Sequence, residues 1–514
     1  MNTPRGLFFA ASIVVVGVVT LHVQLPSVSS FPTPTSISSS SIYTNNCLLR
    51  DTIPLPVPTL PLYSSSKKIS SSSRNNDYHI LYMTSDTITA ENSDDETTTS
   101  ESNDGDATVT QLIFNLVKGI VGAGVLSLPA GIASFADAPS GIIPAVSLIA
   151  IIGGLSAYGF ALIGRCCAYT NTNSYRDAWS ATISEKSSWL PAMAVTFKTI
   201  SATLCYSMIL GDTFVSLLST VGIVSSKIPV TIGLTSTILL PLCLMKNLSS
   251  LAPFSLVGSL GMIYTAVAMA VRYFGKAYTA TGGFSTDNPT LLRPKFGTVG
   301  AEGALTPSVA ILVSMLSTAY MAHFNAPKFY NELKDKTLPK YYKVVSTSFA
   351  ISISIFALIA SVGFLTFGSN SSGLILNNYS TNDGLMNLSK IAVAISLVFS
   401  YPLAFVGARD GTLDLLKMER SPKAQNVLTV ALLTAITCAS LVIPDVSFVM
   451  ALAGATLGNG LIYIFPALMF RGAIKKKVNA TKGEKREVKL ALTSGVAGLL
   501  MGLIGTKMAI ASLM

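Results

Sequence analysis

The chain has 514 residues, of which 50% are hydrophobic and only 12% are charged. Soluble domains carry about 25% charged residues, so this composition is that of a polytopic membrane protein. The formal net charge of +10 does not indicate nucleic-acid binding, because many lysines and arginines lie in short loops between apolar segments, where they set orientation. The six cysteines follow no metal-ligand or disulfide spacing.

Residues 1–84 have the composition of a targeting sequence. Residues 7–23 are apolar, follow Arg5 and precede a Ser/Pro-rich stretch, which is the layout of a secretory signal. Residues 24–84 are rich in Ser, Thr and Pro and mainly basic, as in a transit peptide. With Phe31 just after the signal, the two parts resemble the bipartite presequence of algae with secondary plastids. The resemblance implies a plastid envelope; an ordinary endomembrane signal or an uncleaved anchor, leading to an endomembrane or the plasma membrane, is the alternative.

Residues 85–108 form an acidic linker before the membrane domain, which we expect over 109–512. Residues 86–106 contain no lysine or arginine and are typical of a solvated, disordered segment.

Eleven apolar segments in the membrane domain are long enough to span a bilayer, because a helix needs about 20 residues to cross it. They are helices, since none shows the period-two pattern of a barrel strand. The segments lie near 109–135, 142–164, 191–219, 228–245, 251–271, 306–325, 343–367, 388–408, 426–443, 446–470 and 490–512.

The loops alternate between basic and poorly basic, which places the N-terminus inside and the C-terminus outside by the positive-inside rule. The loop at 368–387 has no basic residue, whereas 471–489 is strongly basic; the long, basic loop 272–305 is an exception. A cleaved secretory signal alone would leave the acidic linker on the translocated side. A plastid route removes this conflict, because a transit peptide would carry the linker into the stroma.

The first segment, "FNLVKGIVGAGVLSLPAGIA", contains helix breakers near mid-membrane. A broken helix in lipid leaves polar backbone groups unsatisfied unless they line a site. An unwound turn at Gly122 and Gly124 would expose the amides of Ala123, Gly124 and Val125 to a carboxylate at the start of a half-helix. The alternative is that these glycines only permit close helix packing.

A second break is expected in the sixth segment, where His323, Asn325 and Pro327 interrupt an apolar helix. It lies five segments after the first, the separation of inverted repeats of five helices. Carbonyls around Ala319 to Ala322 would then face the ammonium of a substrate, and the side chain of Tyr320 would contribute to selectivity.

Five motifs occur in order along these segments: "FNLVKGIVGAGVLSLP", "HFNAPKFYNELKD", "GFLTFGSNSSGLILNNYS", "SYPLAFVGARD" and "IPDVSFVMALAGATLGNGLIYIFPAL". Together they resemble the amino acid/auxin permease family, in particular its sodium-coupled neutral and vacuolar amino acid transporters. The resemblance covers residues 109–512. It implies an all-α polytopic membrane protein of eleven helices in a leucine-transporter-like inverted repeat, with helices 1 and 6 unwound around an amino acid.

The resemblance also places Lys118 where sodium-coupled relatives have an asparagine that helps to hold sodium. A fixed ammonium cannot coordinate sodium, so Lys118 would replace the ion or couple protons, and sodium coupling is doubtful; the alternative is a passive anchor that snorkels to the interface. The matching hydroxyls on the eighth helix would be Ser396 and Ser400, one turn apart.

His323 is the only histidine in the membrane domain. It lies beside the second break and is either a proton-coupling group or a satisfied structural histidine. Lys198 and Asp212 are about 21 Å apart along one helix, too far to pair, and are expected to act in topology or gating. Glu332 is either a solvated loop carboxylate or part of an inner gate.

Two surface features complete the pattern. Asn370, Asn378 and Asn387 stand in N-x-S sequons on the loop without basic residues, and would be glycosylated only if that loop faced a glycosylating lumen. The basic cluster from Arg471 to Lys489 determines topology and also lies where anionic lipid headgroups are found.

These observations predict a transporter of amino acids, neutral ones in particular, that works by alternating access with proton coupling or none. No catalytic, cofactor or metal constellation is present in the sequence, so an enzyme is not expected. The alternative from a different class is a sensor with a transporter fold that signals through residues 86–106. A channel or purely structural subunit is a third interpretation, and it predicts no saturable substrate binding.

Overall fold

The computed structural model describes residues 105–245, 252–284, 287 and 290–512. The presequence and most of the acidic linker, for which the sequence carries predictions, lie outside these residues. The described part is helical, with two isolated parallel bridges, Ala107 to Leu333 and Lys295 to Gly368. Its α-helices are α2 (Val109–Ile120), α3 (Leu128–Ala133), α4 (Ile142–Thr170), α5 (Tyr175–Thr182), α6 (Trp189–Thr220), α7 (Lys227–Leu234), α8 (Leu240–Leu244), α9 (Ala252–Phe274), α10 (Val309–Ala319), α11 (Ala326–Asn331), α12 (Leu338–Phe367), α13 (Gly384–Leu416), α14 (Pro422–Val442), α15 (Val446–Ala453), α16 (Phe465–Lys476) and α17 (Lys482–Ala511).

The expected segments all correspond to helices. Within the described residues nine helices are long and apolar enough to cross a membrane, and the pair Val109–Ile120 and Ala123–Ala133, bent by 43°, makes a tenth. The remaining expected segment corresponds to α9. The all-helical architecture predicted from the sequence is therefore confirmed for the described residues, with ten candidate spans and α9 as a shorter apolar helix at the remaining segment.

Side-chain caps determine where several spans begin. Thr108 and Gln111 form a capping box at α2, with Gln111 N–H donating to Thr108 Oγ1 at 3.3 Å. Thr481 and Glu484 do the same at α17, and Asp383 caps α13. Because these caps satisfy the first amides of each helix, α13 and α17 start earlier than their apolar stretches.

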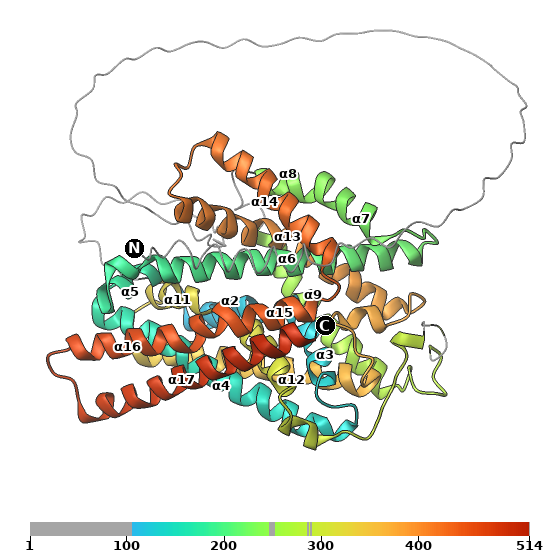
Figure 1. Cartoon of the computed structure of the whole chain (residues 1–514), viewed down its shortest axis with the longest axis horizontal. Helices are drawn as coiled ribbons and strands as arrows, with labels where there is room; N and C mark the ends of the chain where they lie inside the picture. The colour runs from blue at the N-terminus through green and yellow to red at the C-terminus, as the bar shows by residue number, and fades with distance from the viewer. Residues whose placement is uncertain (1–104, 246–251, 285–286, 288–289, 513–514) are drawn as a thin grey trace, which may run out of the picture. The chain divides into compact units, whose positions relative to one another are not determined.

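The spans pack as two groups around α6. Figure 1 shows α7, α8 and α14 along one side of α6, and α4, α12 and α17 on the other side. α13 packs on α6 and α9, while α12 packs on α4 and α2. The core between the helices is filled by aromatic and aliphatic side chains such as Tyr320, Tyr341 and Phe356, none of which is exposed to solvent.

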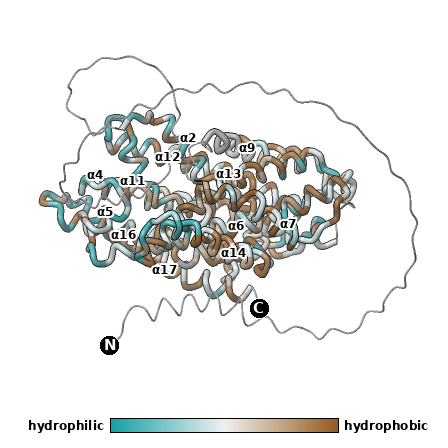
Figure 2. Tube along the Cα trace, turned by 90° about the horizontal axis from the view of Figure 1, so that it is seen from above, coloured by the Kyte–Doolittle hydropathy of each residue, from teal (hydrophilic) through white to brown (hydrophobic). Residues whose placement is uncertain are grey.

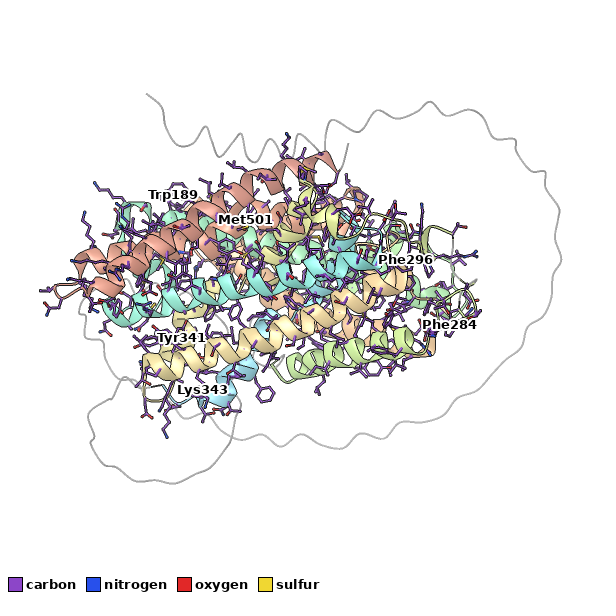
Figure 3. All side chains as sticks on the ribbon, turned by 90° about the horizontal axis from the view of Figure 1, so that it is seen from below. Trp189, Phe284, Phe296, Tyr341, Lys343 and Met501 are labelled. Carbon is purple, nitrogen blue, oxygen red and sulfur yellow. The ribbon has the colours of Figure 1, made fainter. Side chains whose placement is uncertain are left out.

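The loops segregate to the two ends of the bundle, as the alternation of charge requires. Figure 3 shows Tyr341 and Lys343 at one end of the bundle and Phe284 and Phe296 at the other. At the basic end Arg165 of α4 forms an ion pair with Glu487 of α17. At the other end the long loop 275–308 contacts the loop that lacks basic residues, through the bridge between Lys295 and Gly368. The exceptional loop 272–305 therefore lies at the end opposite the basic loops despite its charge. We call this the outer end, as the positive-inside rule assigns it.

Candidate functional site

The first span is interrupted at Val121 and Gly122. α2 ends at Ile120, and a 3₁₀ turn, η1 (Ala123–Ser127), leads into α3. Gly122 N–H donates to Ile120 O at 3.0 Å instead of continuing the α-helical ladder. Gly122 and Gly124 keep accessible surface, whereas Ala123 and Val125 between and after them are buried.

The break frees two of the three amides that the sequence singled out. Val125 N–H donates to Gly122 O at 3.2 Å. The amides of Ala123 and Gly124 have no acceptor among the described residues. Because they are consecutive and lie at the start of a helical turn, they form the kind of donor pair that binds a carboxylate.

The sixth span is interrupted at Tyr320 to Ala322. α10 ends at Ala319, and a 3₁₀ turn, η8 (His323–Asn325), leads into α11. Ala322 N–H donates to Tyr320 O at 2.9 Å and Asn325 N–H to Ala322 O at 2.9 Å. The carbonyls of Ala319 and Met321 accept no hydrogen bond from any described residue. Of the carbonyls expected here, two are therefore free and two are engaged inside the turn.

The two breaks have the same local design. Each consists of an α-helix, a short unwound stretch, a 3₁₀ turn and a second α-helix whose second residue is a proline, Pro129 in α3 and Pro327 in α11. A proline is tolerated in the first turn of a helix because its missing N–H would be unpaired there. Corresponding breaks in the two halves are the hallmark of inverted-repeat transporters.

A third span closes over the first break. An ideal Cβ at Gly124 would lie 2.9 Å from Cε of Met450 in α15, and the Met450 carbonyl accepts a hydrogen bond from Thr318 Oγ1 at 2.6 Å. Gly454 packs so closely on α10 that its Cβ would lie 2.7 Å from Thr318 Oγ1. Met450 and Thr318 thus join spans 1, 6 and 10 around the breaks, and the sequence reasoning missed both.

The tenth span is itself irregular. Two π-helical stretches, η10 (Gly454–Gly458) and η11 (Gly460–Ile464), interrupt it, and Thr456 departs from helical geometry with φ −86° and ψ −110°. Both amide atoms of Asn459, which is 1% exposed, lack a hydrogen-bond partner among the described residues. π-Bulges are frequent at functional sites, and the glycine-rich run "AGATLGNG" was the signal for one.

The side chain of Tyr320 packs between span 6 and spans 2 and 7. Its side chain is fully buried, and its hydroxyl donates to the carbonyl of Ile149 in α4 at 3.2 Å. Its ring packs on Phe356 of α12, with centroids 4.7 Å apart. In this arrangement Tyr320 holds the break of span 6 against spans 2 and 7.

Lys118 lies in the last turn of α2, four residues before Gly122. Its side chain is half-buried and makes no hydrogen bond or ion pair with any residue that the structure describes. The ammonium therefore has no fixed protein partner next to the first break.

Ser396 and Ser400, the expected partners of Lys118 in an ion site, lie on α13, which packs on α6 and α9. The Ser396 side chain packs directly against Gly258 of α9. Ser400 is partly buried. The structure brings Ser396 to the fifth span and gives no contact between either serine and Lys118.

His323 is fully buried beside the second break. Its Nε2 lies 2.9 Å from the carbonyl of Ser156 in α4, so this nitrogen carries the proton and donates. Its Nδ1 has no partner among the described residues, and its ring meets Phe160 edge-on at 5.8 Å. The histidine thus connects span 6 to span 2.

The other charged residues singled out in the sequence lie apart from one another. Lys198 reaches the second break, with Nζ 4.7 Å from the ring centroid of Phe324. Asp212 forms an ion pair with Lys227, at the start of α7, at 2.7 Å. Glu332 forms an ion pair with Lys328 on the inner side, with 3.6 Å between Glu332 Oε1 and Lys328 Nζ.

The outer end of the bundle contains a buried charged cluster that the sequence reasoning did not find. Asp383 is fully buried and accepts two hydrogen bonds from Arg272 Nε and one from Arg272 Nη2, at 2.7–3.1 Å. Tyr278 donates to the same carboxylate at 3.0 Å, and burial together with Asp383 raises the pKa of Tyr278, so it stays a donor.

Lys390, 1% exposed, donates to Ser216 Oγ and Tyr379 O. The sequence did carry a signal for a functional or structural role of Lys390, because it is an ionisable residue inside the apolar segment 388–408.

The three sequon asparagines all use their amide nitrogens within the outer loops. Asn370 donates to Arg293 O at 2.9 Å and Asn387 to Thr381 O at 2.6 Å. Asn378 is fully buried and donates to Asn370 O at 2.8 Å. Asn378 is therefore not accessible to a glycosylating enzyme in this fold.

Comparison with solved structures defines the class of protein. The chain matches the structure described as the inward facing conformation of Mhp1 with a TM-score of 0.50 at 9% identity, over 80% of this chain and 92% of that chain. This likeness, together with the two broken spans five segments apart, confirms the leucine-transporter-like fold expected from the sequence.

Among the described residues no group of His, Cys, Asp and Glu side chains is placed to hold a metal ion.

The family model of the transmembrane amino acid transporter proteins matches residues 105–511. The chain therefore belongs to this family, and its relatives are transporters, not enzymes. It is 27% identical to amino acid transporter AVT6E of Arabidopsis thaliana, over 76% of this chain and 82% of that protein. It is 24% identical to a putative sodium-coupled neutral amino acid transporter 11 of Danio rerio, over 78% of this chain and 86% of that protein.

Proposed function

We propose that this protein carries neutral amino acids across its membrane by alternating access, with the substrate held between the breaks of spans 1 and 6. The observation that carries the proposal is the pair of matching breaks with unpaired backbone groups. The amides of Ala123 and Gly124 bind the substrate carboxylate, and the carbonyls of Ala319 and Met321 bind its ammonium. This recognition involves only the groups that all amino acids share.

Preference for neutral substrates follows from the side chains around the breaks. Met450 and Thr318 are uncharged and lie next to Gly124 and the end of α10. Neither residue offers a charge to pair with, so burying a charged substrate side chain against them costs several kcal/mol. The name of the Danio rerio relative, a putative sodium-coupled neutral amino acid transporter, agrees with the preference for neutral substrates.

Coupling is to protons or to the substrate gradient alone, with Lys118 in the place of a sodium ion. Its ammonium has no ion-pair partner among the described residues and lies one turn from Gly122. A positive charge there repels sodium, and Ser396, the hydroxyl expected to share the ion, packs on Gly258 instead. His323, whose Nδ1 is unpartnered within the described part of the chain, is the second candidate for a proton-coupling group.

The decisive experiment is uptake of labelled amino acids into proteoliposomes, with sodium and proton gradients imposed separately. Saturable uptake of neutral amino acids that is indifferent to sodium supports the proposal. Uptake that requires sodium in the wild type rules out the role given to Lys118. Competition by an excess of unlabelled charged amino acids tests the preference for neutral substrates.

A second candidate is an amino acid sensor that signals through its N-terminal tail. One observation favours it: Ala107, which follows the acidic segment 86–106, is joined by backbone hydrogen bonds to the residues that leave span 6. Deleting residues 86–106 would abolish signalling and leave uptake intact in this case. Substrate binding without flux under every gradient would favour the sensor over the transporter.

We also propose a plastid envelope as the target membrane, on the basis of the signal and transit-like composition of residues 1–84. A fluorescent fusion of residues 1–84 tests this proposal directly. Accumulation in the plastid supports it, and retention in the endoplasmic reticulum or delivery to the cell surface contradicts it.

A further inference from the structure

The inner ends of α16 and α17 line an open basic pocket. It has a volume of about 320 Å³ and lies at the turn between the two helices. Four cationic side chains line it, together with apolar ones; the cations are Arg471, Lys475, Lys477 and Lys485. Figure 1 shows α16 and α17 running side by side toward this turn.

The acidic residues nearby do not neutralise these cations. Residues 471–489 contain eight lysines and arginines but only Glu484 and Glu487 as acids. Glu487 forms an ion pair with Arg165 of α4, and Glu484 forms one with Lys477 at 2.6 Å. Both carboxylates are therefore engaged.

Three of the lining cations, Arg471, Lys475 and Lys485, make no hydrogen bond or ion pair through their side chains with the described part of the chain. They lie on two neighbouring helices around one concavity. Converging cations without counter-ions attract an anion, and a phosphate group accepts hydrogen bonds from several of them at once.

Lys477 connects the pocket to α4. Its Nζ lies 4.4 Å from the ring centroid of Tyr169, and Tyr169 donates to Glu484 at 3.1 Å. The hydrogen bond that Lys477 donates to Glu484 raises the pKa of Lys477, so the ammonium stays charged. Tyr169 of α4 thus helps to position Lys477, while the pocket itself is lined by α16, α17 and the turn between them.

The pocket also lies directly beside an apolar surface. Ile474 and Val488 line it, and Val478 at the turn is 96% exposed. Along α17 the exposed apolar side chains begin at Leu490 and continue through Leu499 and Leu503, which are 61%, 52% and 64% exposed. Figure 2 shows hydrophilic residues gathered at the end of the bundle where α4, α5 and α16 are labelled, next to the hydrophobic body of the helices.

We propose that this pocket binds the phosphate of an anionic phospholipid from the inner leaflet, whose acyl chains lie along the exposed apolar side of α17. A free phosphate ion would use the cations but not the adjoining apolar surface. A lipid uses both, because its headgroup and chains meet at the same depth in the bilayer as the end of α17 and Leu490.

The test compares full-length protein in nanodiscs or detergent with phosphatidylglycerol and with phosphatidylcholine as probes. Native mass spectrometry and the shift of the thermal midpoint measure binding. The double variant Lys475→Gln/Lys485→Gln is expected to bind phosphatidylglycerol about 10–30-fold more weakly, because each juxtamembrane cation contributes about a factor of five. Lys475→Arg/Lys485→Arg keeps both charges and should bind like the wild type.

A matched control removes the same charge elsewhere on the inner side. Lys343 and Lys423 are exposed, and neither forms an ion pair with a described residue. Lys343→Gln/Lys423→Gln should leave phosphatidylglycerol binding within about twofold of the wild type, because neither residue lines the pocket. An equal loss in this control would mean that total surface charge, not the pocket, attracts the lipid.

Two further outcomes would overturn the proposal. Equal binding of phosphatidylglycerol and phosphatidylcholine by the wild type excludes an anionic lipid site. Stabilisation by millimolar inorganic phosphate that phosphatidylglycerol does not compete away would identify a soluble anion site instead. None of these readouts depends on transport, so their failure is distinct from failure of the proposed function.

Discussion

Ala107, which precedes the first span, pairs with Leu333, which follows the sixth, as a parallel backbone bridge. Ala107 N–H donates to Glu332 O at 2.9 Å, and Lys334 N–H donates to Ala107 O at 3.0 Å. The inner ends of the two broken spans are therefore connected by main-chain hydrogen bonds. In the alternating-access cycle proposed above, these ends separate on the inner side, so we infer that this bridge belongs to the closed inner gate.

Ala107→Pro should open this inner connection more often, because proline removes the N–H that donates to Glu332 O. One backbone hydrogen bond contributes about 0.5–1.5 kcal/mol, so the open population should rise roughly 2–10-fold. Hydrogen–deuterium exchange of the peptide that contains residues 332–340 measures the change. Ala107→Ser keeps the N–H and should exchange like the wild type; equal exchange in all three proteins would refute a gating role for the bridge.

Gly124→Leu should abolish uptake while the protein still folds and reaches its membrane. The new side chain would enter the space between Gly124 and Met450 and cover the amides proposed to bind the carboxylate. Gly119→Leu is the matched control, because Gly119 is exposed on the same span and has no atom within 4 Å of an ideal Cβ. Uptake retained by Gly124→Leu would remove the substrate site from this break.

Lys118→Asn should make uptake sodium-stimulated, because the substitution removes the fixed charge and provides an amide oxygen for the ion. Lys118→Arg keeps the charge and should stay independent of sodium. Uptake in sodium buffer compared with choline buffer measures the effect. An unchanged sodium response in Lys118→Asn would leave Lys118 as an interfacial anchor.

Asp383→Asn should destabilise the outer end of the bundle, because it leaves Arg272 without its charged partner. Removing one partner of a fully buried ion pair costs about 3–5 kcal/mol; the Arg272 side chain is 25% exposed, so we expect about 2–3 kcal/mol. Thermal unfolding in detergent measures the loss. Asp335→Asn, which breaks the exposed pair with Lys340, should shift the thermal midpoint far less, because solvent screens that pair. An equal effect of both substitutions would mean that burial adds nothing to the contribution of the Arg272–Asp383 pair.

The sequence predicted the two helix breaks better than the directions of individual side chains. Gly122, Gly124 and Pro327 marked both breaks because glycine and proline act on the chain within one helical turn. The same reasoning did not place Tyr320, which faces α4 and α12, because a helical face can be assigned only when its neighbours are known. It also missed the bulges of span 10, although the glycine run from Gly454 to Gly460 carried the same kind of signal.

What the sequence by itself determined is the class of protein, the eleven apolar segments, the sides on which the loops lie and the two breaks, because apolarity, charge and backbone breakers act along a single helix. Only the tertiary structure decided which residues meet. Asp383 pairs with Arg272, which lies 111 positions earlier in the chain. Lys390 donates a hydrogen bond to Ser216, and Met450 packs against Gly124. These pairings depend on how helices that are distant in the chain pack side by side, and no local pattern encodes that packing.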